Sequence, residues 1–146
     1  MEDDEENFPE LFEQIINDYC GTNKLLDEVD GLELTDGRGF LSRVIRFKLK
    51  WAGGVQDAPD VPTSLVLKVP NTKLVEQLHS SITKSDGTAK DRRLETSRLW
   101  INKLHSTECT VYGLFGQRPP VPVPLCYKHD VGDSDSPGEY DSLVID

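Results

Sequence analysis

Ser64-Leu-Val-Leu-Lys-Val69 is a short apolar run that contains one charged residue, Lys68. With the period of two that marks a β-strand, Lys68 shares its face with Val66, and the opposite face is entirely apolar. Apolar neighbours on both sides indicate that the strand is largely buried. A buried ammonium needs an anionic partner or ligand, because its desolvation costs several kcal/mol. Alternatively, the lysine stem lies along the sheet and its head reaches water.

The composition is that of a single acidic domain. The chain has 146 residues, enough for a hydrophobic core, and its 16 basic and 26 acidic residues give a formal net charge of −10. This balance disfavours nucleic acids and anionic membranes as general partners, but it leaves room for one local basic pocket. No apolar run approaches the ~20 residues of a membrane span, and the acidic N-terminus is unlike a secretory signal.

The cysteines predict neither a disulfide framework nor a zinc site. There are three of them, widely spaced and without a CxxC pair: Cys20, Cys109 and Cys126. This pattern is typical of ordinary thiols in a reducing compartment, so we expect a cytoplasmic protein without bound metal.

An N-terminal helix is the first predicted element. Apolar residues recur at helical spacing after Asn7, a possible cap, and before Gly21, a natural stop; they are Phe8, Leu11, Phe12, Ile15, Ile16 and Tyr19. The polar face is acidic, which favours packing on its own domain over membrane binding. This helix and the acidic lead make up the first predicted segment, residues 1–30.

A β-hairpin is expected next, with a strand over 31–36, a turn at Gly37-Arg38-Gly39 and a second strand over 40–51. Backbone N–H groups at such a tip can hold phosphate oxygens, since glycine lets an anion approach the backbone closely. Glycines at a hairpin tip are also ordinary turn residues. The motif alone therefore leaves both interpretations open.

A short helix is expected over 72–82 and a longer one over 91–115. Glu108 occupies a position on the apolar stripe of the longer helix, which runs through Leu94, Ile101, Leu104, Val111 and Phe115. A carboxylate there is either solvated at the rim of the stripe or directed inward to a cation. Lys68 is the obvious cation, because pairing would offset the desolvation of both charges and hold the ammonium in one place.

Two further strands are expected, over 121–127 and 142–146, around an acidic loop over 129–140. In this order the elements resemble the N-terminal lobe of the protein-kinase-like phosphotransferases. The details are closest to the choline-kinase-like group, related to the ecdysteroid kinases, and within it to a nematode branch of uncharacterised members. The segments that carry the resemblance are Gly37-Arg-Gly-Phe-Leu-Ser-Arg-Val44, Leu65-Val-Leu-Lys-Val69, His105-Ser-Thr-Glu-Cys-Thr-Val-Tyr112, Val121-Pro-Val-Pro124 and Leu143-Val-Ile-Asp146.

The resemblance implies an α+β fold: a curled antiparallel sheet of about five strands, a long helix like the αC helix of kinases and a short N-terminal helix, with residues 31–146 as the lobe. It also implies ATP as the cofactor. Lys68 would contact the α- and β-phosphates, and Glu108 would hold the lysine. The other implied ATP-binding residues are Gly37, Gly39 and Ser42 in the phosphate loop and Val144, Ile145 and Asp146 before the hinge that receives adenine. This chain departs from the family pattern at Ser106, where the family usually has Asn, and at the bulky Arg38.

In this family the catalytic Asp and the Mg²⁺ ligands lie in a C-terminal lobe beyond the hinge, and this sequence ends before such a lobe. We therefore expect no catalytic residue and no metal ligand in the chain, weak binding of ATP and no activity on its own. The function expected from the resemblance is the ATP-binding half of a small-molecule kinase that phosphorylates a hydroxyl of a choline-, ethanolamine- or sterol-like acceptor. The alternative is an inactive, stand-alone binding or regulatory module, with a protein partner over its exposed lobe interface.

Overall fold

The computed structural model describes residues 7–35, 41–54, 60–71, 77, 80–81, 87–115, 122–130 and 142–145. Within these residues the fold is α+β, as expected. The elements in chain order are α1 (Phe8–Cys20), β1 (Leu26–Glu33), β2 (Ser42–Trp51), β3 (Ser64–Pro70), α3 (Gly87–Phe115), β4 (Cys126–Asp130) and β5 (Ser142–Ile145). Gln77, Ser80 and Ser81, which fall in the short helix expected over 72–82, are helical.

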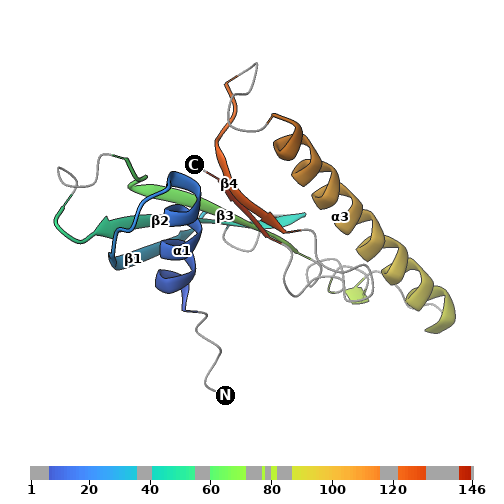
Figure 1. Ribbon diagram of the computed structural model, residues 1–146. Coiled ribbons are helices and arrows are strands. Elements are labelled where there is room, and N and C mark those ends of the chain that lie inside the picture. The colour runs from blue at the N-terminus through green and yellow to red at the C-terminus, as the bar shows by residue number, and fades with distance from the viewer. Residues whose placement is uncertain are drawn as a thin grey trace.

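The described strands form one five-stranded sheet in the order β1-β2-β3-β5-β4, and every neighbouring pair is antiparallel. The antiparallel sheet of about five strands is therefore confirmed. Figure 1 shows α1 against the sheet and α3 to the side of β4, with the N-terminal end of α3 (yellow) far from the strands. The sheet thus has one face that meets α1 and one that meets α3.

β1 begins earlier than the sequence pattern indicated, at Leu26 rather than residue 31. It is matched to β2 from Leu26, opposite Trp51, to Glu33, opposite Ile45. Gly31, which looked like the start of the strand, lies inside it, where the ring of Phe47 occupies the space that a side chain would take. The predicted boundary at residue 30 therefore falls in the middle of a strand.

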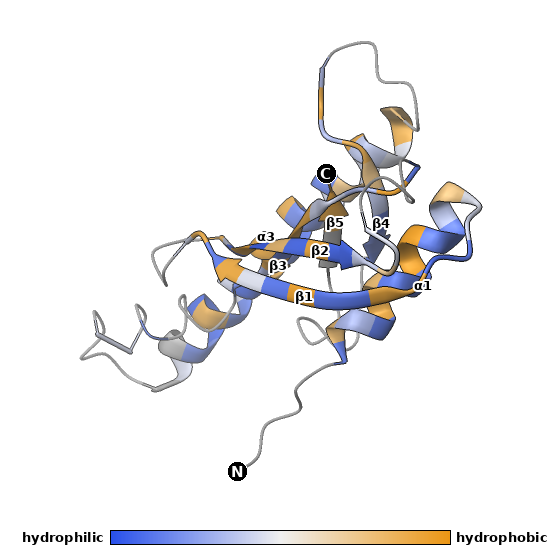
Figure 2. Ribbon diagram, turned by 90° about the vertical axis from the view of Figure 1, so that its left-hand side faces the viewer, coloured by the Kyte–Doolittle hydropathy of each residue, from blue (hydrophilic) through white to orange (hydrophobic). Residues whose placement is uncertain are grey.

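The hydrophobic core lies between α1 and one face of the sheet. Phe12, Ile16 and Leu65 are fully buried there, and the ring of Phe12 meets that of Phe47 edge-on with centroids 4.8 Å apart. This packing agrees with the amphipathic pattern of α1, whose alternation of hydrophobic and hydrophilic residues is visible in Figure 2. Asn7 is at the N-cap but its side chain makes no capping hydrogen bond, and Gly21 ends the helix with φ of 67°.

α3 meets the sheet through a different line of residues from the one its apolar pattern predicted. Its most buried side chains are Ile101, His105 and Cys109, which follow one another at intervals of four residues. Leu104 and Val111, placed on the inner stripe by the sequence pattern, are exposed instead. α3 is therefore rotated about its axis relative to the orientation that the apolar pattern predicts. His105, which has a hydrogen-bond partner on β4, and the small side chain of Cys109 face the sheet instead.

The strand expected over 121–127 begins later than predicted. The strand predicted over 121–127 is β4, Cys126–Asp130, and residues 122–125, which include two prolines, precede it without strand pairing. Proline has no N–H to donate to a neighbouring strand, which explains why pairing begins only after Pro124. β4 therefore extends into the region predicted as an acidic loop, of which residues 131–140 lie outside the described residues.

Two glycine substitutions should differ in their effect on the free energy of unfolding. A Cβ at Gly31 would lie 2.7 Å from Cε1 of Phe47, so Gly31→Ala should lower the free energy of unfolding by about 1–3 kcal/mol through overpacking. A Cβ at Gly113, in α3, would lie 3.6 Å from Nε2 of His129, which is ordinary contact. Gly113→Ala should therefore be neutral or stabilise by up to about 1 kcal/mol, as alanine favours helix.

Urea unfolding followed by circular dichroism measures both effects on the whole chain. Equal stability of the Gly31→Ala variant and the parent would contradict the close approach of the Phe47 ring. Gly113→Ala controls for the general effect of replacing glycine by alanine.

Candidate functional site

An ion pair joins the sheet to α3 at the position expected from the sequence. Nζ of Lys68, on β3, lies 2.5 Å from Oε1 of Glu108, on α3. The two side chains are 27% and 31% exposed, so both charges are partly desolvated. Alternation along β3 turns Lys68 away from the core, because Leu65 and Leu67 occupy the face that meets α1. The ammonium therefore pairs with the helix, as one of the two interpretations of the sequence required.

His105 lies one turn before Glu108 and fixes the same part of the helix to β4. Its Nε2 is 3.0 Å from the backbone oxygen of Asp130 and 3.5 Å from Sγ of Cys109. A carbonyl oxygen only accepts, so Nε2 carries the hydrogen and donates it to Asp130. His105 is 5% exposed, and this bond satisfies a donor that would be costly to bury alone.

Half-buried apolar residues surround Lys68 on its face of the sheet. Val44, on β2, is directly opposite Lys68, and Val66, two residues before Lys68, pairs with Ile145 of β5. Ser42, opposite Pro70, is on the same face two residues before Val44. The site therefore combines a fixed ammonium, a hydroxyl and an apolar surface next to it.

Tyr112 adds a neutral hydroxyl group one turn after Glu108. Burial raises the pKa of this phenol, and the charge of the Glu108 carboxylate raises it further. Burial also raises the pKa of the thiol of Cys126, which stands at the start of β4. Both groups are therefore uncharged at neutral pH, and neither competes with Glu108 for the ammonium.

The remaining predicted site residues are placed as follows. Val144 pairs with Leu67 and is buried in the core on the face opposite Lys68, so only its backbone could meet a ligand at the site. Ile145, by alternation, is on the Lys68 face. Gly37, Gly39 and Asp146 lie outside the described residues, and their roles stay predictions.

Two residues of this site were not singled out by their sequence pattern. His105 and Tyr112 are the two ends of the segment His105-Ser-Thr-Glu-Cys-Thr-Val-Tyr112, whose pattern assigns no role to either. Helical spacing gives one signal for each residue. His105 is one turn before Cys109, and Tyr112 is one turn after Glu108. The partner of His105 is a backbone carbonyl 25 residues downstream, for which a sequence carries no marker.

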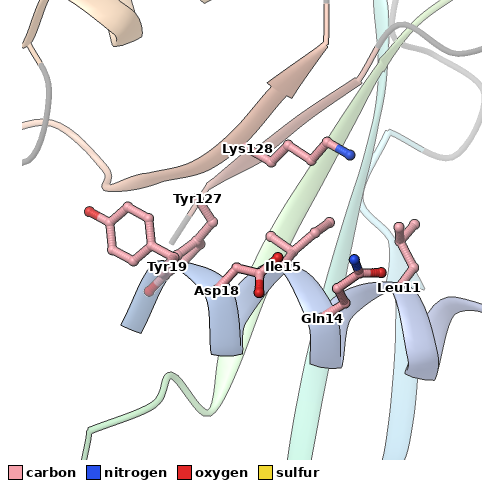
Figure 3. A pocket seen from close by; sticks show the side chains of 7 residues that line it. All are labelled: Leu11, Gln14, Ile15, Asp18, Tyr19, Tyr127 and Lys128. Carbon is pink, nitrogen blue, oxygen red and sulfur yellow. The ribbon is translucent and has the colours of Figure 1, made fainter. Parts of the chain in front are cut away.

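A separate groove of about 370 Å³ lies between α1 and β4, lined by Leu11, Gln14, Ile15, Asp18, Tyr19, Tyr127 and Lys128. Figure 3 shows these side chains, with Lys128 above α1 and extending alongside it. Lys128 is opposite Val144, on the face of the sheet that meets α1. The groove is thus on the other side of the sheet from Lys68 and is not part of the ion-pair site.

The described parts of the chain show no metal site, no disulfide and no membrane-spanning helix. There, no three His, Cys, Asp or Glu side chains gather as they would around a metal ion, and the three cysteines are free thiols. Neither of the long described helices has a stretch apolar enough to cross a membrane.

The coupling between Lys68 and Glu108 can be measured with a double-mutant cycle. Lys68→Met, Glu108→Gln and the double variant should give a coupling energy of about 1–2 kcal/mol, because both charges are partly removed from water. The exposed pair Lys50–Glu28 is the matched control, with Nζ and Oε2 3.1 Å apart. Its cycle should give only about 0.2–0.5 kcal/mol. Equal coupling in the two cycles, measured by urea unfolding, would contradict a special role for the first pair.

Comparison with known proteins identifies a family but no activity. The curated proteins and the solved structures contain no match to this chain. The profile of a family described as uncharacterized oxidoreductase dhs-27 matches residues 11–135, which include both members of the ion pair. The expectation of an uncharacterised nematode family fits this result, whereas the description names no kinase. The chain belongs to the uncharacterized oxidoreductase dhs-27 family.

Proposed function

We propose that this chain is the ATP-binding half of a small-molecule kinase. The observation that carries the proposal is the ion pair between Lys68 on β3 and Glu108 on α3. A lysine of the third strand, held by a glutamate of the following helix, is how protein kinases contact ATP phosphates. The strand order β1-β2-β3-β5-β4 and the glycines between β1 and β2 in the sequence are compatible with the same arrangement.

The ion pair would make Lys68 a fixed donor for phosphate. An ammonium has three N–H donors, and Glu108 accepts one of them. The side chain keeps 27% of its surface exposed, so the remaining donors can meet a ligand from solvent. Glu108 thus orients the lysine and limits its motion before a phosphate arrives, which lowers the entropic cost of binding.

The surface next to Lys68 suits the base of a nucleotide. Val44, Val66 and Ile145 are half-buried on the Lys68 face, so a flat ring laid on them would remove apolar surface from water. These residues would contact the ring from one side only. Binding by the purified chain should therefore be weak, with a dissociation constant in the millimolar range or above.

The proposed role is limited to binding and orientation. When bound, ATP would supply the phosphoryl group, and the hydroxyl of a choline-, ethanolamine- or sterol-like acceptor would receive it. The base and the Mg²⁺ ligands that such a transfer needs are not among the residues assigned here. Ser42 would contribute a hydroxyl to the phosphate oxygens.

The oxidoreductase in the family description is not favoured by this geometry. Dinucleotide-binding oxidoreductases place a glycine-rich turn between a strand and a helix of a parallel sheet. All the described strand pairs here are antiparallel. Gly37 and Gly39 stand between two strands, β1 and β2, rather than between a strand and a helix. Phosphate binding through Lys68 is therefore preferred to hydride transfer.

A second candidate, a binding module without catalysis, is favoured by the outer surface of α3. Its exposed apolar residues are Leu99, Trp100, Leu104, Val111 and Leu114, the last 79% exposed. Such a concentration on one helix is typical of a surface that another protein covers. This candidate differs from the first in requiring no contact between Lys68 and a nucleotide.

An acyl-phosphate derivative of ATP distinguishes the two candidates, because it transfers its acyl group to a lysine beside the bound phosphates. Because binding is weak, we expect free ATP at millimolar concentration to suppress the labelling of Lys68 but not that of Lys50. Lys50 is the internal control, since its side chain is 70% exposed on β2. Tryptic mass spectrometry of the labelled chain measures both sites.

Glu108→Gln should reduce the ATP-dependent part of the labelling, because the ammonium is no longer oriented. The kinase proposal is wrong if ATP fails to protect Lys68, or if ATP protects both lysines equally. Such a result would leave the binding module as the preferred function.

A further inference from the structure

We propose that His105 is a positioning residue that sets the place of the Glu108 carboxylate against Lys68. It acts through the helix, by tying α3 to the backbone of β4, and it touches neither the ligand nor Lys68. The functional meaning of this role rests on the proposed ATP site. The structural effect, the orientation of the lysine, stands independently of any nucleotide.

The contact between α3 and the sheet is narrow, which gives one directed bond a large influence. α3 meets β3 and β4, and its N-terminal end extends away from the strands (Figure 1). Leu104, Val111 and Leu114 are exposed, so they do not press the helix onto the sheet. Docking of the helix therefore depends on the line of Ile101, His105 and Cys109.

Glu108 stands between two contacts of the helix with β4. One turn before it, Nε2 of His105 donates to the backbone oxygen of Asp130 at 3.0 Å. Just over one turn after it, Gly113 lies against the ring of His129, close enough that an added Cβ would be 3.6 Å from Nε2. A rotation or shift of α3 that moved the carboxylate would have to break the first contact.

The hydrogen bond of His105 fixes the rotation of α3 about its axis, which an apolar side chain at this position would not do. Burial of an apolar residue at 105 would hold the helix near the sheet, but the hydrophobic effect does not select one rotation. The bond to Asp130 has a preferred distance and angle and therefore selects one. The neighbouring Cys109, whose Sγ is 3.5 Å from Nε2, is small enough to leave this bond in place.

Chemical reactivity of Lys68 without nucleotide tests the proposal. An ammonium paired with a carboxylate reacts slowly with acetic anhydride, and loss of the pair raises the rate. His105→Phe keeps the ring and removes the donor; His105→Gln keeps an N–H that can reach Asp130. Glu108→Gln defines the rate for complete loss of the pair. Lys50 reports on general reactivity in every variant.

We expect His105→Phe to raise the labelling of Lys68 relative to Lys50 about fivefold, the change that loss of one hydrogen bond produces. His105→Gln should stay within about twofold of the parent, since the bond is retained. This rescue by a conservative variant separates positioning from simple filling of space, because Phe resembles the imidazole in size and shape more than Gln does.

Parent-like labelling of Lys68 in His105→Phe would overturn the proposal, and so would an equal rise in His105→Phe and His105→Gln. If His105→Phe loses its cooperative unfolding, His105→Asn replaces it, because its shorter amide stops short of Asp130. His105→Asn should then label as His105→Phe is expected to, and parent-like labelling overturns the proposal. Nucleotide is absent throughout, so failure of the ATP site, seen with the acyl-phosphate probe, is a separate result.

Discussion

The structure depends on how a charge is accommodated in a strand that is mostly buried. β3 lies in the middle of the sheet, and each of its residues is buried or half-buried. Lys68 cannot join the core formed with α1, and it is only partly exposed on the other face. The partly buried ammonium needs an anionic partner, and Glu108 of α3 provides it. The position of α3 follows from this requirement together with its contacts to β4.

The two faces of the sheet meet their helices through different kinds of contact. On the α1 face, aromatic and aliphatic side chains such as Phe12, Phe47 and Leu65 form a continuous core. The other face adds two directed polar contacts to α3, the ion pair of Lys68 and the hydrogen bond from His105 to a backbone oxygen. Non-directional packing gives the sheet its stability, whereas directed bonds define a geometry in which a ligand could be oriented.

The sequence predicted those features in which a residue differs in polarity from its neighbours in a regular pattern. Lys68 and Glu108 were recognisable because each is a charge inside an apolar pattern, and the amphipathic α1 showed a regular stripe. The start of β1 was missed because a glycine such as Gly31 usually marks a turn. Only the structure shows that the ring of Phe47 lies against it inside the strand. The rotation of α3 was missed because the partner of His105 is a carbonyl, which every residue possesses. For β5, alternation in so short a strand does not reveal that Val144 faces the core.

β1 and β4 end the described sheet, and each edge has a feature that discourages another strand from joining it. Four of the eight residues of β1 are acidic: Asp27, Glu28, Asp30 and Glu33. Lys50 and Arg43 of β2 neutralise two of them, and the rest leave the edge negative. Two copies approaching edge to edge would repel each other, while Pro122 and Pro124 limit pairing ahead of β4. The acidic composition that disfavours nucleic acid as a partner thus also discourages edge-to-edge association of the open sheet.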